Sequence, residues 1–416
     1  MTFLFYFFLL ILSVNSAYAH LHGEKEQSKV YNYKSPDNIK PYQSIEHEEE
    51  YFGCSGYLRT GFLQTKIRSV DTSSATAIAG ELGCGYQAND YIKAHLGVFG
   101  VLDTGVNSQN DDNIHADFFN RKKDSYLMLG EAVLTLSYDN FEAHLGRQNF
   151  DSPHLDGDDL RMVANLFEAY LIDYHFSDEL YFGAGFVREA SGWENGGNLS
   201  HFIPIGEALG GKGGNAWLSW LTYEKEEHIS GNAWFYLIPD HLTIFYGELI
   251  VSQPLTSDIS YSVGIQYDWG QDSGEARLGD IDAHTLGVMS SVSGFDLTLT
   301  AAYNKNFGYT GAVASVGGGP FFTSLEDQTL DAATGEDTQS ILFGLEYALS
   351  SEFSLGVNWA EFRATDKNDY HTEEINYFLN YNWNDKLSAE FMYAVIDDKN
   401  SSEDTDQIRA IITYRY

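Results

Sequence analysis

The sequence has 416 residues, with 60 acidic and 24 basic side chains, a formal net charge of -36 and 15% aromatic residues. This aromatic content excludes intrinsic disorder, which requires little apolar surface. The acidity argues against nucleic acid as a partner, because phosphate binding needs a basic face. Two cysteines are too few for a disulfide scaffold or a zinc ribbon. The length itself allows either several soluble domains or one large β-barrel.

The first 19 residues are almost wholly apolar up to Val14 and then contain Ala17-Tyr18-Ala19. A short apolar core before a small-x-small step predicts a secretory signal peptide, cleaved near Ala19. A membrane anchor is the alternative, but this run is shorter than the ~20 residues that a spanning helix requires. We therefore expect an exported chain.

Residues 20–50 form a polar segment rich in glutamate, with His20, His22 and His47. These histidines and glutamates could bind a metal, but their spacing does not repeat. We expect a periplasmic leader of the kind found at many chain termini.

From residue 51 onward the sequence alternates between apolar and polar residues. In the last segment Ile408, Ile412 and Tyr416 share one face of a strand with period two, and Gln407 and Arg409 share the other. A soluble β-sandwich alternates as well. However, the polar faces are rich in Asn, Ser, Thr and Gly, and aromatic residues stand at the ends of the apolar faces. Both features are typical of an outer-membrane barrel with aromatic girdles.

The alternation predicts eighteen strands, and the connections between them are alternately long and short, as in barrels with periplasmic termini. Pro239-Asp240 is a tight link where a long loop is due, so sixteen strands is the alternative. A barrel of either size encloses an aqueous channel. We therefore predict an all-β, transmembrane antiparallel β-barrel over residues 51–416, in contact with the lipid of a Gram-negative outer membrane. The predicted strands are 55–66, 75–86, 91–102, 125–138, 140–148, 166–176, 179–188, 215–224, 230–238, 241–251, 258–268, 282–292, 295–304, 339–349, 353–363, 374–383, 386–396 and 407–416.

Two stretches carry a family resemblance. The first is Gly146-Arg147-Gln148 followed by Pro153, Asp158-Asp159-Leu160-Arg161-Met162 and Phe167-Glu168, and the second is Gly318-Gly319-Pro320-Phe321-Phe322-Thr323-Ser324. They resemble the OprD-type porin family, in which the fifth strand leads into a constriction loop and a long seventh loop folds inward. The resemblance implies an eighteen-stranded barrel for passive uptake of small water-soluble nutrients, in which basic lumen residues guide carboxylate-bearing solutes. The chain departs from the family in its polar leader and its acidity.

Alternation places four basic residues, Arg59, Lys93, Arg409 and Arg415, on lumen faces. A closed barrel puts the first and last strands side by side, so we expect these residues on one wall. They form a candidate basic ladder that biases ion passage by charge. Alternatively, they pair with Glu81 or Glu390 and only hold the wall together. A selectivity role and such pairing are compatible.

The segment Asn149–Asn165 is the candidate constriction loop. Its candidate residues, together with Arg147 just before it, are Arg147, Asp151, His154, Asp156, Asp158, Asp159 and Arg161. An acidic loop opposite a basic wall creates a transverse field across the water path. Asp156-Gly157-Asp158-Asp159 could instead ligate a hard cation, but it lacks the spacing and final glutamate of an EF-hand. A solvated outer loop is the third interpretation. We expect neither a metal nor a cofactor.

Cys54 and Cys84 fall on the same face of neighbouring strands, and their midpoint, residue 69, lies in the first predicted loop. This register places them opposite each other, and the periplasm supports disulfides. We expect a structural disulfide.

The sequence thus predicts a porin for passive, charge-biased diffusion of small solutes and ions, with a preference for cations that follows from the net charge. It contains no Gly-x-Ser-x-Gly, His-Glu-x-x-His or P-loop motif, so we expect no enzyme. An adhesin or a barrel enzyme that acts through its loops, and a soluble secreted β-protein, are the alternatives. We expect the barrel-assembly machinery to recognise the last strand, which ends in Tyr416. A monomer and a trimer both agree with this size.

Overall fold

The computed structural model describes residues 52–416 except 69, 109, 121, 196–198, 226–227, 334, 366–369 and 402–403. The predicted signal peptide and the polar leader with its three histidines lie outside the described residues. Almost all regular structure within the described part is β-strand.

Eighteen long antiparallel strands make up the wall, and a further two-residue strand pairs only with one of them. The wall strands are β1 (Phe52–Ile67), β2 (Asp71–Asn89), β3 (Ile92–Asp103), β4 (Tyr126–Tyr138), β5 (Phe141–Gln148), β6 (Leu166–His175), β7 (Leu180–Ser191), β9 (Ala216–Lys225), β10 (Ile229–Ile238), β11 (Leu242–Pro254), β12 (Ile259–Asp272), β13 (Asp282–Gly294), β14 (Leu297–Asn306), β15 (Gln339–Ala348), β16 (Phe353–Arg363), β17 (His371–Asn384), β18 (Leu387–Asp398) and β19 (Thr405–Arg415). The remaining elements are β8 (Ile203–Pro204), α2 (Ile205–Ala208) and the 3-10 turns η2 (Asp111–Asn113), η3 (Ala116–Phe118) and η4 (Leu330–Ala332).

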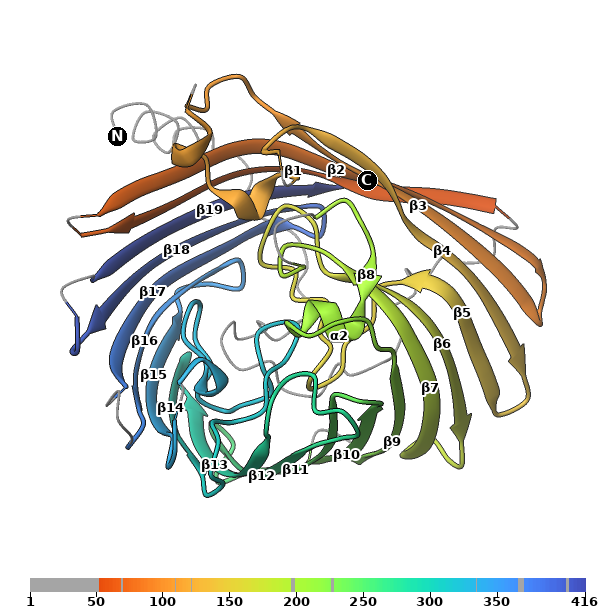
Figure 1. The fold of residues 1–416 in the computed structure, drawn as a ribbon. Coiled ribbons are helices and arrows are strands. Elements are labelled where there is room, and N and C mark those ends of the chain that lie inside the picture. Colours follow the sequence, from red (N-terminus) through yellow and green to blue (C-terminus); the bar gives the residue numbers. More distant parts are fainter. Residues whose placement is uncertain are drawn as a thin grey trace.

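The barrel is closed because β1 pairs with both β2 and β19 (Figure 1). Every neighbouring pair of wall strands is antiparallel, and β7 passes directly to β9. The prediction of an eighteen-stranded barrel is confirmed, and the alternative of sixteen strands is wrong. The tight link that favoured sixteen is real: residues 239–241 join β10 and β11, with Asp240 at a φ of 62°.

The predicted faces of the strands agree with the exposure of their side chains. Leu58 and Leu96 are 54% and 56% exposed on the outer face, where lipid surrounds a barrel of this kind, whereas Arg59 is 4% exposed on the inner face. No helix within the described residues is long and apolar enough to span a membrane.

Two long connections fold into the barrel instead of standing at its mouth (Figure 1). The first is the constriction loop, residues 149–165, and the second is the long loop, residues 307–338. They meet in a parallel bridge between Leu155 and Val316. The Asp156 N–H donates to the Val316 carbonyl at 2.8 Å, and the Val316 N–H donates to the His154 carbonyl at 3.0 Å.

Large aromatic side chains fill the lumen face of β9, β10 and β11. Trp220, Trp234, Tyr236 and Tyr246 are each at most 2% exposed and belong to one cluster with Leu155 and Val316 of the two inner loops. Aromatic residues were predicted at the ends of the lipid-facing surface. This aromatic wall on the lumen face was not predicted. It exists because the loops cover it and keep water away from the rings.

Candidate functional site

The constriction loop docks onto the wall through Arg59 of β1. The Arg59 guanidinium donates from Nη1 and Nη2 to the two carboxylate oxygens of Asp159, at 2.6 and 2.8 Å. It also donates to the Arg161 carbonyl at 2.6 Å and to Thr413 Oγ1 of β19 at 3.1 Å. One wall arginine therefore holds two residues of the loop and ties together the first and last strands.

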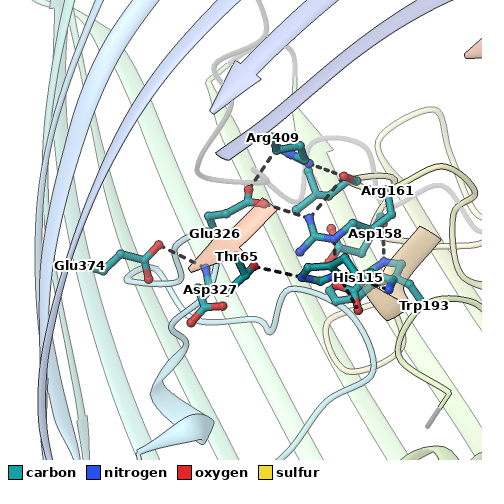
Figure 2. A network of polar contacts seen from close by, with 11 residues as sticks. Thr65, His115, Asp158, Arg161, Trp193, Glu326, Asp327, Glu374 and Arg409 are labelled. Carbon is teal, nitrogen blue, oxygen red and sulfur yellow. Dashed lines mark hydrogen bonds and ion pairs between the residues drawn. The ribbon is translucent and has the colours of Figure 1, made fainter. Parts of the chain in front are cut away.

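Glu326 of the long loop lies between two arginines, one from the constriction loop and one from the wall (Figure 2). Its Oε1 is 2.9 Å from Arg161 Nη1, and its Oε2 is 3.1 Å from Arg409 Nη2 of β19. The three side chains are only 2% to 4% exposed. Burial alone would lower the pKa of the Arg161 guanidinium, but Glu326 and Asp117 outweigh it and raise this pKa above its usual value.

Arg161 connects two further loops to this cluster. Its Nε lies 3.3 Å from Asp117 Oδ2 in the connection between β3 and β4. Its guanidinium stands 4.6 Å from the ring centroid of Trp193, which follows β7. The Trp193 indole N–H in turn donates to the Asp158 carbonyl at 3.2 Å. Four connections of the barrel therefore meet around one guanidinium.

Glu374 of β17 holds the long loop at a second point beside Glu326, as Figure 2 shows. Its two carboxylate oxygens accept the backbone N–H groups of Asp327 and Gln328, at 3.2 and 2.7 Å. Glu374 is fully buried. Because these amides directly follow Glu326, the turn that carries Glu326 is fixed by backbone as well as side-chain contacts.

On the opposite side of the lumen, the inner loops rest on the aromatic wall. His154 Nε2 lies 3.1 Å from Asp268 Oδ1 of β12, and both side chains are at most 2% exposed. The rings of Tyr236 and Tyr246 meet the imidazole edge to face. The loops therefore cross the lumen from an apolar wall to a charged one.

Glu194, just after β7, joins the two inner loops where they cross. Its Oε2 accepts the Gly317 N–H of the long loop and, at 3.2 Å, the side-chain amide of Asn165 from the constriction loop. Burial, together with the nearby Asp158 carboxylate, raises the pKa of the Glu194 carboxyl to about 8. This junction is therefore sensitive to proton concentration near neutrality.

Two of the acidic residues of the constriction loop accept backbone N–H groups of the loop itself. Asp151 accepts the Gly157 N–H at 2.9 Å and Asp156 accepts the Asp158 N–H at 3.0 Å, so both carboxylates brace the loop itself. Asp158, with a φ of 39°, is 2% exposed. Asp159 of this loop forms an ion pair with Arg59 of the wall, and Glu326 of the long loop forms one with Arg409.

The predicted ladder is split into two parts. Arg59 and Arg409 lie beside the loops and form ion pairs with Asp159 and Glu326, respectively. Lys93 is the second residue of β3 and Arg415 is the last of β19, so both lie at the end of the barrel with the short turns, where they are exposed. Arg415 contacts Ser388 at 3.4 Å.

Arg147 lies in the barrel wall and not in either inner loop. It still lies in β5, two residues after Leu145, whose neighbours Leu134 and Tyr170 are exposed on the outer face. Its Nε is 3.5 Å from Glu168 Oε2, and the Tyr170 hydroxyl donates to the same carboxylate. β5 ends at Gln148, as the sequence predicted, and period two within this strand directs Arg147 outward.

Cys54 and Cys84 are direct partners in the β1–β2 register, with their Cα atoms 4.1 Å apart and a disulfide between them. The bond joins the two strands of the first hairpin at the end away from its turn.

Sequence reasoning missed several residues of the constriction, namely Asp117, Trp193, Glu194, Asp268, Glu326 and Glu374. Glu326 follows the stretch Gly318–Ser324 by only two residues, so proximity to that stretch was the available signal. The others lie in separate connections or strands, and only the folded loops bring them together.

The fold agrees with that of several solved structures. They include OccAB4 of Acinetobacter baumannii (18% identity, 89% of this chain and 99% of that chain, TM-score 0.74), OccK9 (OpdG) of Pseudomonas aeruginosa (17%, 88% and 98%, TM-score 0.76) and a BenF-like porin from Pseudomonas fluorescens Pf-5 (15%, 88% and 98%, TM-score 0.76). Residues 79–416 match the sequence profile described as outer membrane porin, OprD family. A search among curated proteins found no match.

Proposed function

Because the chain belongs to the OprD family of outer-membrane porins and is an outer-membrane channel for small solutes, we propose that its passage is passive and favours cations. The proposed selectivity rests on one observation. The two lumen arginines beside the constriction, Arg59 and Arg409, are neutralised by loop carboxylates at 2.6 and 3.1 Å. They therefore cannot act as free positive charges toward a passing anion.

Acidic groups are left to set the local potential. The Asp159 side chain keeps 49% of its surface exposed although it pairs with Arg59. Glu81 on β2 and Glu131 on β4 stand on the two strands that flank β3, and the net charge of the whole chain is -36. A water-filled path lined by one sign of charge concentrates ions of the opposite sign. The family resemblance implies guidance of carboxylate-bearing solutes, and we propose the opposite preference for this chain.

A role as an adhesin or as a barrel enzyme is less well supported by this geometry. An adhesin would present its long connections at the surface, whereas the constriction loop and the long loop fold into the lumen (Figure 1). The His154–Asp268 pair, which has the residue types of an acid–base site, is sealed beneath Tyr236 and Tyr246. A solute cannot reach it, so we propose no enzymatic role.

Reconstitution into a planar lipid bilayer tests the proposal. We expect discrete conductance steps, and in a KCl gradient a reversal potential displaced toward the potassium equilibrium potential. Displacement toward the chloride potential would reject the cation preference. Absence of conductance steps from correctly folded protein would reject the open channel.

We further propose that the barrel-assembly machinery recognises the last strand. β19 closes the barrel against β1, and the Tyr416 hydroxyl donates to the Glu81 carbonyl at 2.9 Å. Deletion of Tyr416 should lower the amount of assembled barrel, measured as the fraction whose gel mobility changes on heating. Assembly at the normal level would reject this interaction.

A further inference from the structure

A second group of ionisable side chains faces the lumen next to the constriction. Glu81 of β2, His95 of β3 and Glu131 of β4 each offer one ligand atom, and these atoms all lie within 4.8 Å of one another. The group includes an imidazole as well as two carboxylates. It contains neither the wall arginines nor the residues that hold the inner loops together.

The contacts within this group leave one carboxylate unused. His95 Nε2 lies 3.0 Å from Glu131 Oε2, and the Asn149 N–H donates to Glu131 Oε1 at 3.3 Å. The Glu81 carboxylate makes no hydrogen bond or ion pair with any other residue that the structure describes. Two carboxylates held this close repel each other unless a cation or a proton lies between them.

Two glycines provide the space in which the three side chains converge. Gly83 pairs with Gly97 across β2 and β3. A Cβ at Gly83 would lie 2.8 Å from His95 Cε1 and 3.1 Å from Glu81 Oε1, and a Cβ at Gly97 would lie 2.9 Å from Glu131 Oε2. Any larger residue at either position would displace the side chains of the group.

We propose that Glu81, His95 and Glu131 bind a divalent transition-metal ion, with Zn²⁺ as the representative, inside the lumen. One imidazole and two carboxylates are a ligand set that suits such ions. Zinc–ligand distances of about 2.0–2.2 Å require ligand atoms about 3.4 Å apart. His95 and Glu131 already meet this spacing, so completing the metal site requires only a rotation of the unpaired Glu81 side chain toward them. Water fills the remaining positions, and the ion stays exchangeable.

The other group with this composition does not have the same unsatisfied charge. Glu361, His371 and Glu373 also lie within 4.8 Å of one another, but on the outer face of β16 and β17. There Arg363 pairs with Glu361, and Lys399 lies 3.4 Å from Glu373. Each carboxylate of this outer group already has a cationic partner, whereas Glu81 has none.

Metal bound at the lumen group would change the ion path. Two carboxylates near the constriction would be neutralised, and the metal and its waters would occupy part of the lumen. Because Glu131 also accepts the N–H of Asn149, the first residue of the constriction loop, the metal would lie beside the start of this loop. Both effects lower the conductance for small cations.

Single-channel recording during titration with ZnCl₂ tests the inference. We expect a saturable fall in wild-type conductance at fixed KCl. Glu81→Gln and His95→Ala should each require at least tenfold more Zn²⁺ for the same fall. Glu81→Gln is the more informative variant, because the Glu81 carboxylate has no hydrogen bond to lose. Glu346→Gln, which removes a lumen carboxylate on β15 outside the group, should respond as the wild type does.

The outcomes separate this inference from the proposed function. Wild-type channels that conduct but show no change in conductance with Zn²⁺ would overturn the metal site. A wild-type response to Zn²⁺ in both Glu81→Gln and His95→Ala would overturn it as well. A proton shared between the two carboxylates would then explain why they lie so close together. Should folded protein show no conductance, the open channel fails instead. The site would then be judged by Co²⁺ absorption spectra of the detergent-solubilised barrel carrying His371→Ala, which removes the outer group. A ligand-field spectrum that Glu81→Gln abolishes supports the site, and its absence rejects the site.

Discussion

The two walls that hold the inner loops differ in the chemistry of their contacts. The aromatic wall, Trp220, Trp234, Tyr236 and Tyr246 on β9 to β11, packs against Leu155 and Val316 through apolar surface. The charged wall, Arg59 and Arg409 with Glu374, binds the same loops through ion pairs and backbone amides. Apolar contacts are non-directional and involve no charged group that a change of pH could neutralise. Buried ion pairs are directional and fail when one partner is removed.

This difference indicates a division of roles. The aromatic wall keeps the loops in the lumen, and the charged wall fixes the orientation of their far ends beside the water path. Substitutions in the aromatic wall should therefore lower the stability of the whole barrel. Substitutions in the charged wall should change the conductance more than they change the stability.

The largest expected effect comes from Trp234→Ala in the aromatic wall. Trp234 is 1% exposed and stacks between Trp220, at 5.0 Å between ring centroids, and Tyr236, at 5.9 Å. Loss of a buried tryptophan costs about 4 kcal/mol. We expect a lower temperature for the heat-induced change in gel mobility. Phe235→Ala, the lipid-facing neighbour with 42% exposure, is the control, and an equal loss in both variants would contradict a special role of the inner face.

Next in size is Glu326→Gln in the charged wall. It leaves the buried Arg161 and Arg409 without their shared carboxylate, at a cost of about 3 kcal/mol to loop docking. We expect higher and noisier single-channel conductance, with a smaller change in barrel unfolding than for Trp234→Ala. Glu336→Gln, on an exposed residue of the same loop, is the control. Wild-type conductance in Glu326→Gln would show that the aromatic wall alone sets the loop position.

A smaller effect is expected at Glu194, which joins the loops between the two walls. Its pKa is raised from 4.5 to about 8 by burial and by Asp158. The docked loops therefore keep the Glu194 proton to a higher pH than the undocked loops do. The resulting stabilisation of docking is complete below pH 4.5 and is lost as the pH rises through 8. The loss is at most about 1.4 kcal/mol per pH unit. We expect channel noise to rise from pH 6 to pH 9.

Glu194→Gln should remove this pH dependence, so that its channel noise at pH 9 is as low as at pH 6. Glu207→Gln, an exposed residue of the same connection, should keep the wild-type dependence. A flat pH profile in the wild type, or an unchanged profile in Glu194→Gln, would show that protonation at this junction does not control the loops.

Much of the barrel could be predicted from the sequence because period two is a local property. Leu58, Arg59 and Arg409 take the faces that alternation assigns, since each side chain follows from the position of its own strand. The family resemblance groups Arg147 with the constriction loop, although the predicted strand 140–148 already contains this residue. The aromatic wall had a signal: residues 233–238, Ala-Trp-Phe-Tyr-Leu-Ile, are apolar on both faces, as expected for a strand covered on both sides.

The partners in the constriction could not be predicted in the same way. Glu326 is 165 residues from Arg161 in the chain, and Glu374 receives amides from a loop that begins on another strand. Loop conformation decides these pairs, and no periodicity governs it. Asp159 could be selected as a constriction residue, but which of four nearby aspartates reaches the wall depends on the backbone turn at Asp158, where φ is 39°.

The smallest expected effect, Asp159→Asn, tests whether the charged wall also sets selectivity. Asp159 is 49% exposed, so solvent screens its pair with Arg59 and the loss of docking is about 1 kcal/mol or less. Arg59 keeps its bonds to the Arg161 carbonyl and Thr413, which hold it in place while its charge becomes uncompensated. We therefore expect nearly normal conductance and a reversal potential that moves toward the chloride potential. Asp112→Asn, on an exposed residue of the connection between β3 and β4, should move it less. Equal shifts in the two variants would mean that selectivity follows total charge, and the charged wall would then serve only to orient the loops.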